Sequence, residues 1–214
     1  MKIGVFGTGM VGNAIATKLV QVGHDVRMGS RTAGNDKATG WVKSVGARAS
    51  EGTFADAAAF GELLFNCTSG GVSLSALEAA GAANLKGKVL VDVSNPLART
   101  PEGMTLSVCN TDSVAEQLQR AFPDLKVVKA LNTLTAPLMV NPSLLPGEHD
   151  VFMCGNDDGA KARVSQLLKE SFGWKNVVDL GDLSAARGQE MYVIFWVRMF
   201  GALKSPMFNI HVVR

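Results

Sequence analysis

Cysteine is scarce in this chain of 214 residues: there are three, and no two of them form a Cys-x-x-Cys pair. This excludes a disulfide-rich scaffold and a zinc site built on paired cysteines, and an odd number of thiols is typical of a reducing compartment. Charged residues make up only 19% of the chain, with a formal net charge of +2. Since no cluster of Lys and Arg stands out, we do not expect nucleic acid as a partner.

Long apolar runs are also lacking. The most apolar segment, 192–203, is interrupted by Arg198 and is shorter than the roughly 20 residues that span a bilayer. At the N-terminus, residues 3–6 are apolar or small and lead directly into a glycine-rich turn, which does not match a secretory signal. We therefore expect a soluble, cytoplasmic protein with no membrane partner.

Hydrophobic residues make up 47% of the chain, enough for a substantial core. Apolar strand segments alternate with helical segments. We expect strands over 2–6, 24–28, 47–50, 63–67, 88–93, 126–131, 150–154 and 176–180. We expect helices over 13–22, 40–45, 53–61, 74–83, 113–122, 159–172 and 184–203.

This alternation predicts a doubly wound α/β fold with a mainly parallel sheet, because parallel strands need long crossover connections that helices supply. No Pro/Gly/Ser-rich linker interrupts the sequence. We therefore expect one domain over 1–214, in which 150–214 form a short C-terminal α/β extension packed on the same body.

The glycine-rich turn after the first strand carries the clearest chemical signal. Gly7, Gly9 and Gly12 follow the spacing Gly-x-Gly-x-x-Gly between a strand and a helix. In that context glycine allows a tight turn and lets backbone N–H groups approach a pyrophosphate, and the start of the helix adds partial positive charge. The turn therefore predicts a Rossmann-type dinucleotide site, and a purely structural turn is the weaker interpretation.

The end of the second strand indicates which dinucleotide binds. An NAD site usually has an acidic residue here to bind the ribose 2′-hydroxyl, but no Asp or Glu lies within 27–34. Ser30 and Arg31 stand there instead, a hydroxyl and a guanidinium that suit a 2′-phosphate. Lys37 adds a second positive charge, although an ordinary loop lysine is an equally good interpretation. The pattern predicts NADP(H).

Small polar residues follow three later strands. Ligands of doubly wound sheets lie beyond the carboxyl ends of the strands, so these residues are candidates for contact with the nicotinamide and its ribose. They are Cys67, Thr68, Ser94, Asn95, Pro96, Ala130 and Asn132. For Asn95 and Pro96, ordinary turn chemistry explains the residues equally well.

The order of motifs resembles a known family. The motifs are G-T-G-M-V-G, G-H-D-V, G-S-R-T, D-V-S-N-P-L, K-A-L-N-T, C-G-N-D-D-G-A-K and L-G-D-L. This order resembles the NADPH:coenzyme F420 oxidoreductase family and its bacterial relatives over essentially the whole chain, and the reductase domain of the STEAP metalloreductases is similar. The resemblance implies that a hydride passes directly between NADPH and a 5-deazaflavin.

The resemblance also implies roles for single residues. Those that would line the pyrophosphate are Thr8, Gly9, Met10 and Val11. Ser30, Arg31 and Lys37 would bind the 2′-phosphate, and Ala130 would lie on the nicotinamide side. In the C-terminal tail, Phe208 and Ile210 would lie near the deazaflavin. Segment 67–71 departs from the bulkier segment of the archaeal enzymes, so the acceptor is a deazaflavin, a flavin or a small carbonyl compound.

Hydride transfer between two bound cofactors needs mainly proximity and exclusion of water, so we predict no catalytic side chain. A non-catalytic module that senses NADP(H) is an alternative, and it would also lack a catalytic side chain. A small-carbonyl or imine reductase of the β-hydroxyacid dehydrogenase type is another alternative, although that type normally has a longer helical domain. A STEAP-like ferric reductase would need free flavin here.

The apolar helix expected near the C-terminus has two interpretations. Its aromatic and aliphatic residues favour a helix that is mostly core, yet their breadth around the helix also suits a homodimer interface or a wall against a ring. We expect mostly core.

Overall fold

The computed structural model describes residues 1–101 and 103–213. In this part of the chain, eight strands form one sheet in the order β10-β9-β8-β5-β4-β1-β2-β3. Their bounds are β1 (Lys2–Phe6), β2 (Asp25–Ser30), β3 (Ala49–Thr53), β4 (Leu63–Asn66), β5 (Val89–Asp92), β8 (Lys126–Ala130), β9 (Asp150–Gly155) and β10 (Asn176–Asp179). Strands β1 to β5 and β8 are parallel, whereas β9 runs antiparallel to β8. The predicted doubly wound, mainly parallel sheet is confirmed.

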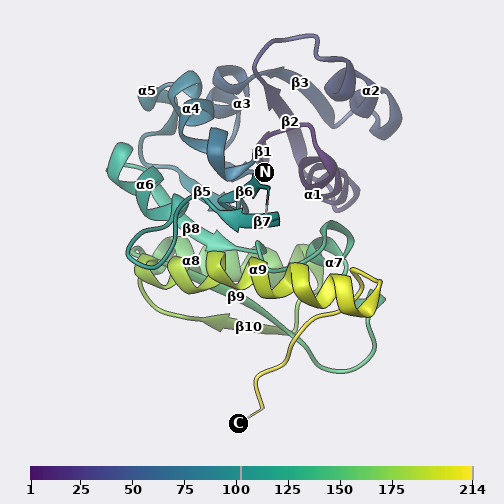
Figure 1. Cartoon of the computed structure of the whole chain (residues 1–214). Helices are drawn as coiled ribbons and strands as arrows, with labels where there is room; N and C mark the ends of the chain where they lie inside the picture. The colour runs from purple at the N-terminus through teal and green to yellow at the C-terminus, as the bar shows by residue number, and fades with distance from the viewer. Residues whose placement is uncertain (102, 214) are drawn as a thin grey trace.

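Helices cover both faces of this sheet (Figure 1). One face packs against α1 (Met10–Gln21), α2 (Asp36–Val45), α7 (Ala136–Val140), α8 (Asp158–Leu167) and η2 (Leu168–Phe172). The other packs against α3 (Phe54–Phe60), α4 (Gly70–Ala80), α5 (Ala82–Leu85), α6 (Val114–Ala121), η3 (Leu183–Ala185) and the start of α9 (Ala186–Leu203).

Two hydrophobic cores result because alternate residues of a strand point to opposite faces. In β1, Val5 packs with Ile15 and Leu19 of α1. The next residue, Phe6, lies in the other core, where its ring meets that of Phe54 edge-on at 5.8 Å. Strands buried on both faces explain why the sequence shows continuous apolar runs instead of alternation.

Two short strands after β5 are not predicted from the sequence. Strands β6 (Leu97–Thr100) and β7 (Gly103–Leu106) pair antiparallel as a separate sheet of two strands. Most of this hairpin is exposed or half-buried, so it lacks the apolar pattern by which buried strands are recognised. The short helices α5, α7 and η1 (Pro142–Leu144) escape prediction because each is too short to show a helical period.

Helix α9 is less buried than expected. Its buried residues are Ala186, Gln189, Glu190 and Val193. By contrast, Phe195, Phe200 and Leu203 are 53%, 43% and 51% exposed. The prediction that this helix is mostly core is wrong, because a helix that lies across one face of the sheet buries only one side (Figure 1). Among the described residues, none of the helices combines the length and hydropathy of a membrane span.

Candidate functional site

The carboxyl ends of β1, β2, β4, β5 and β8 lie at one edge of the sheet, because these strands are parallel. The strand order changes direction between β1 and β4, and ligands of such sheets bind outside this switch point. Turn 7–12 follows β1 and Ser30 ends β2. Cys67, Ser94 and Asn132 follow β4, β5 and β8. The structure thus brings the residues predicted from separate motifs to one edge.

The glycine turn is tight at both ends and open in the middle. Gly7 has a φ of 111°, and its N–H donates to the carbonyl of Gly29 at 2.9 Å. A Cβ on Gly12 would overlap the carbonyl oxygen of Gly7, whereas a Cβ on Gly9 would meet nothing within 4 Å. Open space at Gly9 fits a pyrophosphate that approaches the backbone closely.

Helix α1 begins differently from several other helices. Asn35, Ser113 and Asp157 cap α2, α6 and α8, and each side chain accepts from a backbone N–H of the first turn. Gly9 caps α1 without a side-chain hydrogen bond, and the first turn of α1 has no acidic residue. The first N–H groups of α1 therefore present their partial positive charge to an anion at the turn.

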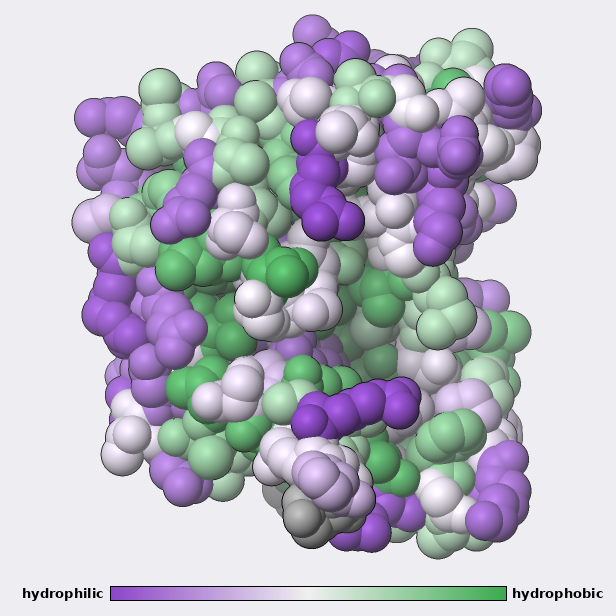
Figure 2. Space-filling view, turned by 45° about the horizontal axis from the view of Figure 1, so that its top comes forward, coloured by the Kyte–Doolittle hydropathy of each residue, from purple (hydrophilic) through white to green (hydrophobic). Residues whose placement is uncertain are grey.

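A groove of about 620 Å³ runs along this turn. The residues that line it are Thr8, Gly9, Met10, Asn13, Ala14, Lys37, Ala136 and Pro137. Lys37 thus faces the same groove as the glycine turn, which supports the binding interpretation of this lysine. Figure 2 shows a hollow in this view of the molecule, with hydrophobic side chains around it.

The residues predicted to bind the 2′-phosphate lie at the end of β2. Ser30 is nearly buried, and its hydroxyl donates to the carbonyl of Thr32 at 2.6 Å. Arg31 is exposed. The carboxylate of Glu51, from neighbouring β3, accepts from the N–H of Gly34 at 3.0 Å. The sequence does not predict this acidic neighbour, because it becomes close only through strand pairing.

Two asparagines join the loops after β5 and β8. Asn95 Nδ2 donates to the carbonyl of Asn132 at 2.8 Å, and Asn132 Nδ2 donates to Asn95 Oδ1 at 2.9 Å. Asn132 Nδ2 also donates to the carbonyl of Gln189 in α9 at 2.9 Å. Between β8 and Asn132, Leu131 has a φ of 67°, a strained conformation for a branched side chain. These contacts fix the backbone where the nicotinamide is predicted to lie.

Other predicted residues at this edge differ in accessibility. Ala130 is fully buried and Ser94 is 3% exposed, so in this structure neither is open to a ligand. Cys67 and Thr68 are half-buried, and Pro96 is buried. Burial, with Asp92 adding, raises the pKa of the Cys67 thiol well above its usual value. This cysteine therefore stays a neutral thiol.

A buried charged cluster that the sequence does not predict lies directly behind these loops. Lys129 Nζ donates to Asp92 Oδ2 at 2.8 Å, to Glu190 Oε1 at 2.7 Å and to the carbonyl of Ser94 at 2.5 Å. The side chains of Lys129, Asp92 and Glu190 are 0%, 0% and 2% exposed. The sequence offers only one signal for this buried cluster. It is a lysine inside an apolar strand that is followed by an asparagine-containing loop.

Each charge in this cluster is satisfied by further hydrogen bonds. Asp92 Oδ1 accepts from Asn66 Nδ2 at 2.7 Å and from the Ser94 hydroxyl at 2.8 Å. Glu190 accepts from the first two N–H groups of α6, at Val114 and Ala115. Burial raises the pKa of Glu190, and the positive charge of Lys129 lowers it. The effect of burial is the larger, so the pKa of Glu190 is raised. Burial lowers the pKa of Lys129, whereas the carboxylates of Asp92 and Glu190 raise it. Together the two carboxylates outweigh burial, so the pKa of Lys129 is raised.

The tail residues predicted near the deazaflavin pack against the extension. Phe208 stacks on Trp196 of α9, with ring centroids 5.4 Å apart. The carbonyl of Ile210 accepts from the N–H of Asp150, the first residue of β9, at 3.0 Å. Both residues thus lie on the C-terminal extension, and their contact with an acceptor stays a prediction.

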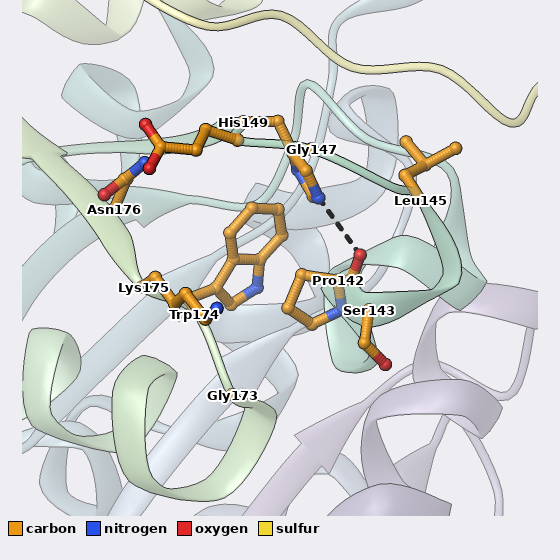
Figure 3. Close-up of a pocket in the computed structure, with 10 residues that line it drawn as sticks. Pro142, Ser143, Leu145, Gly147, His149, Gly173, Trp174, Lys175 and Asn176 are labelled. Carbon is orange, nitrogen blue, oxygen red and sulfur yellow. Dashed lines mark hydrogen bonds between the residues drawn. The ribbon is translucent and has the colours of Figure 1, made fainter.

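A second pocket lies between the starts of β9 and β10 and the α7–η1 region (Figure 3). It has a volume of about 290 Å³, and Trp174 and His149 form part of its wall. The two rings meet edge-on at 5.2 Å, and His149 Nε2 lies 3.0 Å from the carbonyl of Pro142. None of the residues predicted from the sequence lines this pocket.

Comparison with known proteins identifies the family. The family model described as NADP oxidoreductase, coenzyme F420-dependent, matches residues 2–96. A crystal structure from Arthrobacter sp. FB24, whose proposed activity is that of an F420-dependent NADP-reductase, is 47% identical, with 100% of both chains covered and a TM-score of 0.94. The chain belongs to this family. The resemblance inferred from the motif order is confirmed.

More distant relatives include other reductases. The F420-dependent NADP reductase of Methanocaldococcus jannaschii is 31% identical over 105 residues, which are 48% of this chain and 46% of that protein. Metalloreductase STEAP3 of Rattus norvegicus is 34% identical over 194 residues, 88% of this chain and 36% of that protein. The chain thus spans less than half the length of these two relatives. An imine reductase from Aspergillus terreus, at 20% identity and a TM-score of 0.66, shares the fold.

The buried cluster behind the loops should be essential for stability in this family member. Lys129→Met leaves Asp92 and Glu190 buried without their cation, which should lower the free energy of unfolding by about 3–5 kcal/mol. Lys126→Met on the same strand removes an exposed pair with Asp157 and should cost less than about 1 kcal/mol. Urea unfolding of both variants checks this, and equal losses would contradict it.

Proposed function

We propose that this protein is an NADP(H)-dependent oxidoreductase that transfers a hydride between NADPH and a deazaflavin, such as coenzyme F420, or a flavin-like acceptor. One observation carries the proposal: the uncapped start of α1 and the Ser30–Arg31 corner lie at the same edge as the loops that Asn95 and Asn132 lock together. Family membership supports the reaction class.

The preference for NADP(H) follows from charge at the end of β2. Arg31 is exposed, and Lys37 lines the groove of the glycine turn. A guanidinium binds a phosphate with two hydrogen bonds, and an ammonium adds a point charge. The carboxylate of Glu51 also lies near this corner, where it accepts from the N–H of Gly34.

The proposed reaction requires little acid–base catalysis by protein side chains. NADPH supplies a hydride, and the acceptor gains that hydride together with one proton from solvent. The chain has to hold two rings in contact and exclude water. The neutral Cys67 thiol and the apolar side chains around the hollow suit this role.

The same proposal includes a cytoplasmic protein and a homodimer. Cys67, Cys109 and Cys154 are free thiols in the structure, which fits a reducing compartment. The side of α9 that carries Phe195, Phe200 and Leu203 is exposed, and apolar surface of this kind suits an interface between copies of the chain.

Arg31 should set the preference between the two dinucleotides. We expect the unchanged protein to bind NADPH at least about tenfold more tightly than NADH, a difference of about 1.4 kcal/mol. Arg31→Ala should bring the two dissociation constants close together, as measured by titration calorimetry. Arg48→Ala, which removes only an exposed pair with Asp25, should leave the ratio unchanged. Comparable affinities in the unchanged protein would refute the NADP(H) assignment.

The acceptor class is tested by NADPH oxidation. Purified protein is mixed with NADPH and, in parallel, coenzyme F420, FMN, FAD and a panel of small aldehydes, ketones and imines, while absorbance of NADPH is followed. We expect turnover with coenzyme F420 or a flavin. Turnover with carbonyls or imines alone would favour the small-carbonyl or imine reductase. Tight NADPH binding with every acceptor left unchanged would favour the sensing module.

A further inference from the structure

The loop that follows β2 is held in place by two side-chain hydrogen bonds. The Ser30 hydroxyl donates to the carbonyl of Thr32 at 2.6 Å. The N–H of Gly34 donates to Glu51 Oε2 at 3.0 Å, and Gly34 has a φ of 72°, a left-handed conformation that glycine adopts readily. Arg31 lies between these two contacts and is exposed. A carboxylate from β3 therefore helps to hold the loop that presents Arg31.

Strand pairing puts Glu51 and Ser30 on the same face of the sheet. Met28 of β2 pairs with Glu51 of β3, and Ser30 pairs with Thr53. Side chains two residues apart on a strand point to the same face, and Met28 packs in the core that α1 and α2 cover. A strand spacing of about 4.8 Å and a rise of about 3.3 Å per residue place the Cα atoms of Ser30 and Glu51 roughly 8 Å apart.

Charges of both signs surround this corner. Arg31 and Lys37 attract a 2′-phosphate, and the carboxylates of Glu51 and Asp36 repel it. Asp36 is exposed in the first turn of α2. Glu51 is half-buried and bonded directly to the loop, so its charge is the less screened of the two. NADH has no phosphate at this position, and the same repulsion therefore acts on it far less.

We propose that Glu51 is a specificity-determining residue of this site and that it acts in two opposite ways. Its hydrogen bond to Gly34 holds the loop that presents Arg31 to NADPH. Its negative charge weakens the binding of the 2′-phosphate, so Glu51 limits the preference for NADPH over NADH. The inference rests on the proposed function, in which Ser30 and Arg31 bind the 2′-phosphate.

Glu51→Gln separates the two effects, because the side-chain amide still offers an oxygen to the N–H of Gly34 but carries no charge. At low ionic strength the dissociation constant of NADPH should fall by about three- to tenfold, the effect of one charge at this distance. The dissociation constant of NADH should change by less than about twofold, because the repelled phosphate is missing. Titration calorimetry measures both, and the gain for NADPH should shrink as salt is added.

Glu62→Gln is the matched control, because it removes the same charge from the opposite edge of the sheet. Glu62 is exposed and directly precedes β4, whereas the loop follows the carboxyl end of β2. Its dissociation constants for both dinucleotides should match those of the unchanged protein. An equal gain in both variants would assign the effect to the net charge of the whole protein and overturn the inference. An unchanged or higher dissociation constant of NADPH in Glu51→Gln would also overturn it.

Glu51→Ala tests the hydrogen bond to the loop. This variant loses the charge and the contact with Gly34 together, so it should bind NADPH about three- to tenfold more weakly than Glu51→Gln, the effect of one hydrogen bond. Equal NADPH affinities of the two variants would show that the loop does not need this contact, which overturns the positioning role. Far-UV circular dichroism of each variant establishes that folded proteins are compared.

Failure of the proposed function would look different. In that case the unchanged protein binds NADPH and NADH equally and Arg31→Ala changes neither affinity, which rejects the 2′-phosphate site and the role of Glu51 together. If the unchanged protein prefers NADPH and Arg31→Ala removes this preference, but Glu51→Gln leaves it as it was, the role of Glu51 alone is rejected.

Discussion

The ammonium group of Lys129 is enclosed by the carboxylates of Asp92 and Glu190, and the shape of the strand-end loops depends on it. Removing a charge from water is costly unless partners surround it. Here the partners come from β5, from its following loop and from α9, all within 2.8 Å of Nζ. Glu190 in turn caps the start of α6. One buried cation therefore ties together segments that are far apart in the chain.

This constraint suits the proposed hydride transfer between two bound ligands. Ser94 bonds to both Lys129 and Asp92, and Asn95 beside it locks onto Asn132. Reacting atoms must be held within a few tenths of an ångström for efficient transfer. For the proposed reaction, the ionic cluster behind the loops supplies this precision and keeps its own charges buried. The dinucleotide side depends on different physics, namely the open backbone at Gly9 and the uncapped start of α1.

The candidate dinucleotide site could be predicted from the sequence because its signals are local, and its binding role stays a prediction. Gly7, Gly9 and Gly12 lie within six residues, and the absence of an acidic residue around Ser30 is equally local. The sheet followed from the alternation of apolar segments. Boundaries of the main strands and helices differ from prediction by a few residues at most places.

The charged cluster behind the strand-end loops was not accessible from the sequence, because it depends on contacts between distant segments. Lys129 and Glu190 are 61 positions apart, and neither residue type in isolation indicates a buried pair. Hairpin β6–β7 is too exposed to show a pattern. The amino-acid composition of α9 predicted a mostly buried helix. Apolar residues occur all around this helix, so they do not reveal which side the sheet covers.

The reversal of β9 has a consequence for how this fold can diversify. Because β9 runs antiparallel to β8 and β10 runs parallel to β9, both strands start at the edge where the earlier strands end. Asp150, at the start of β9, holds the tail there through its backbone N–H. The last third of the chain can therefore change its loops and tail at the ligand edge while the nucleotide-binding strands stay as they are. Substrate range and nucleotide choice become separately adjustable, both in evolution and in an engineered chimera.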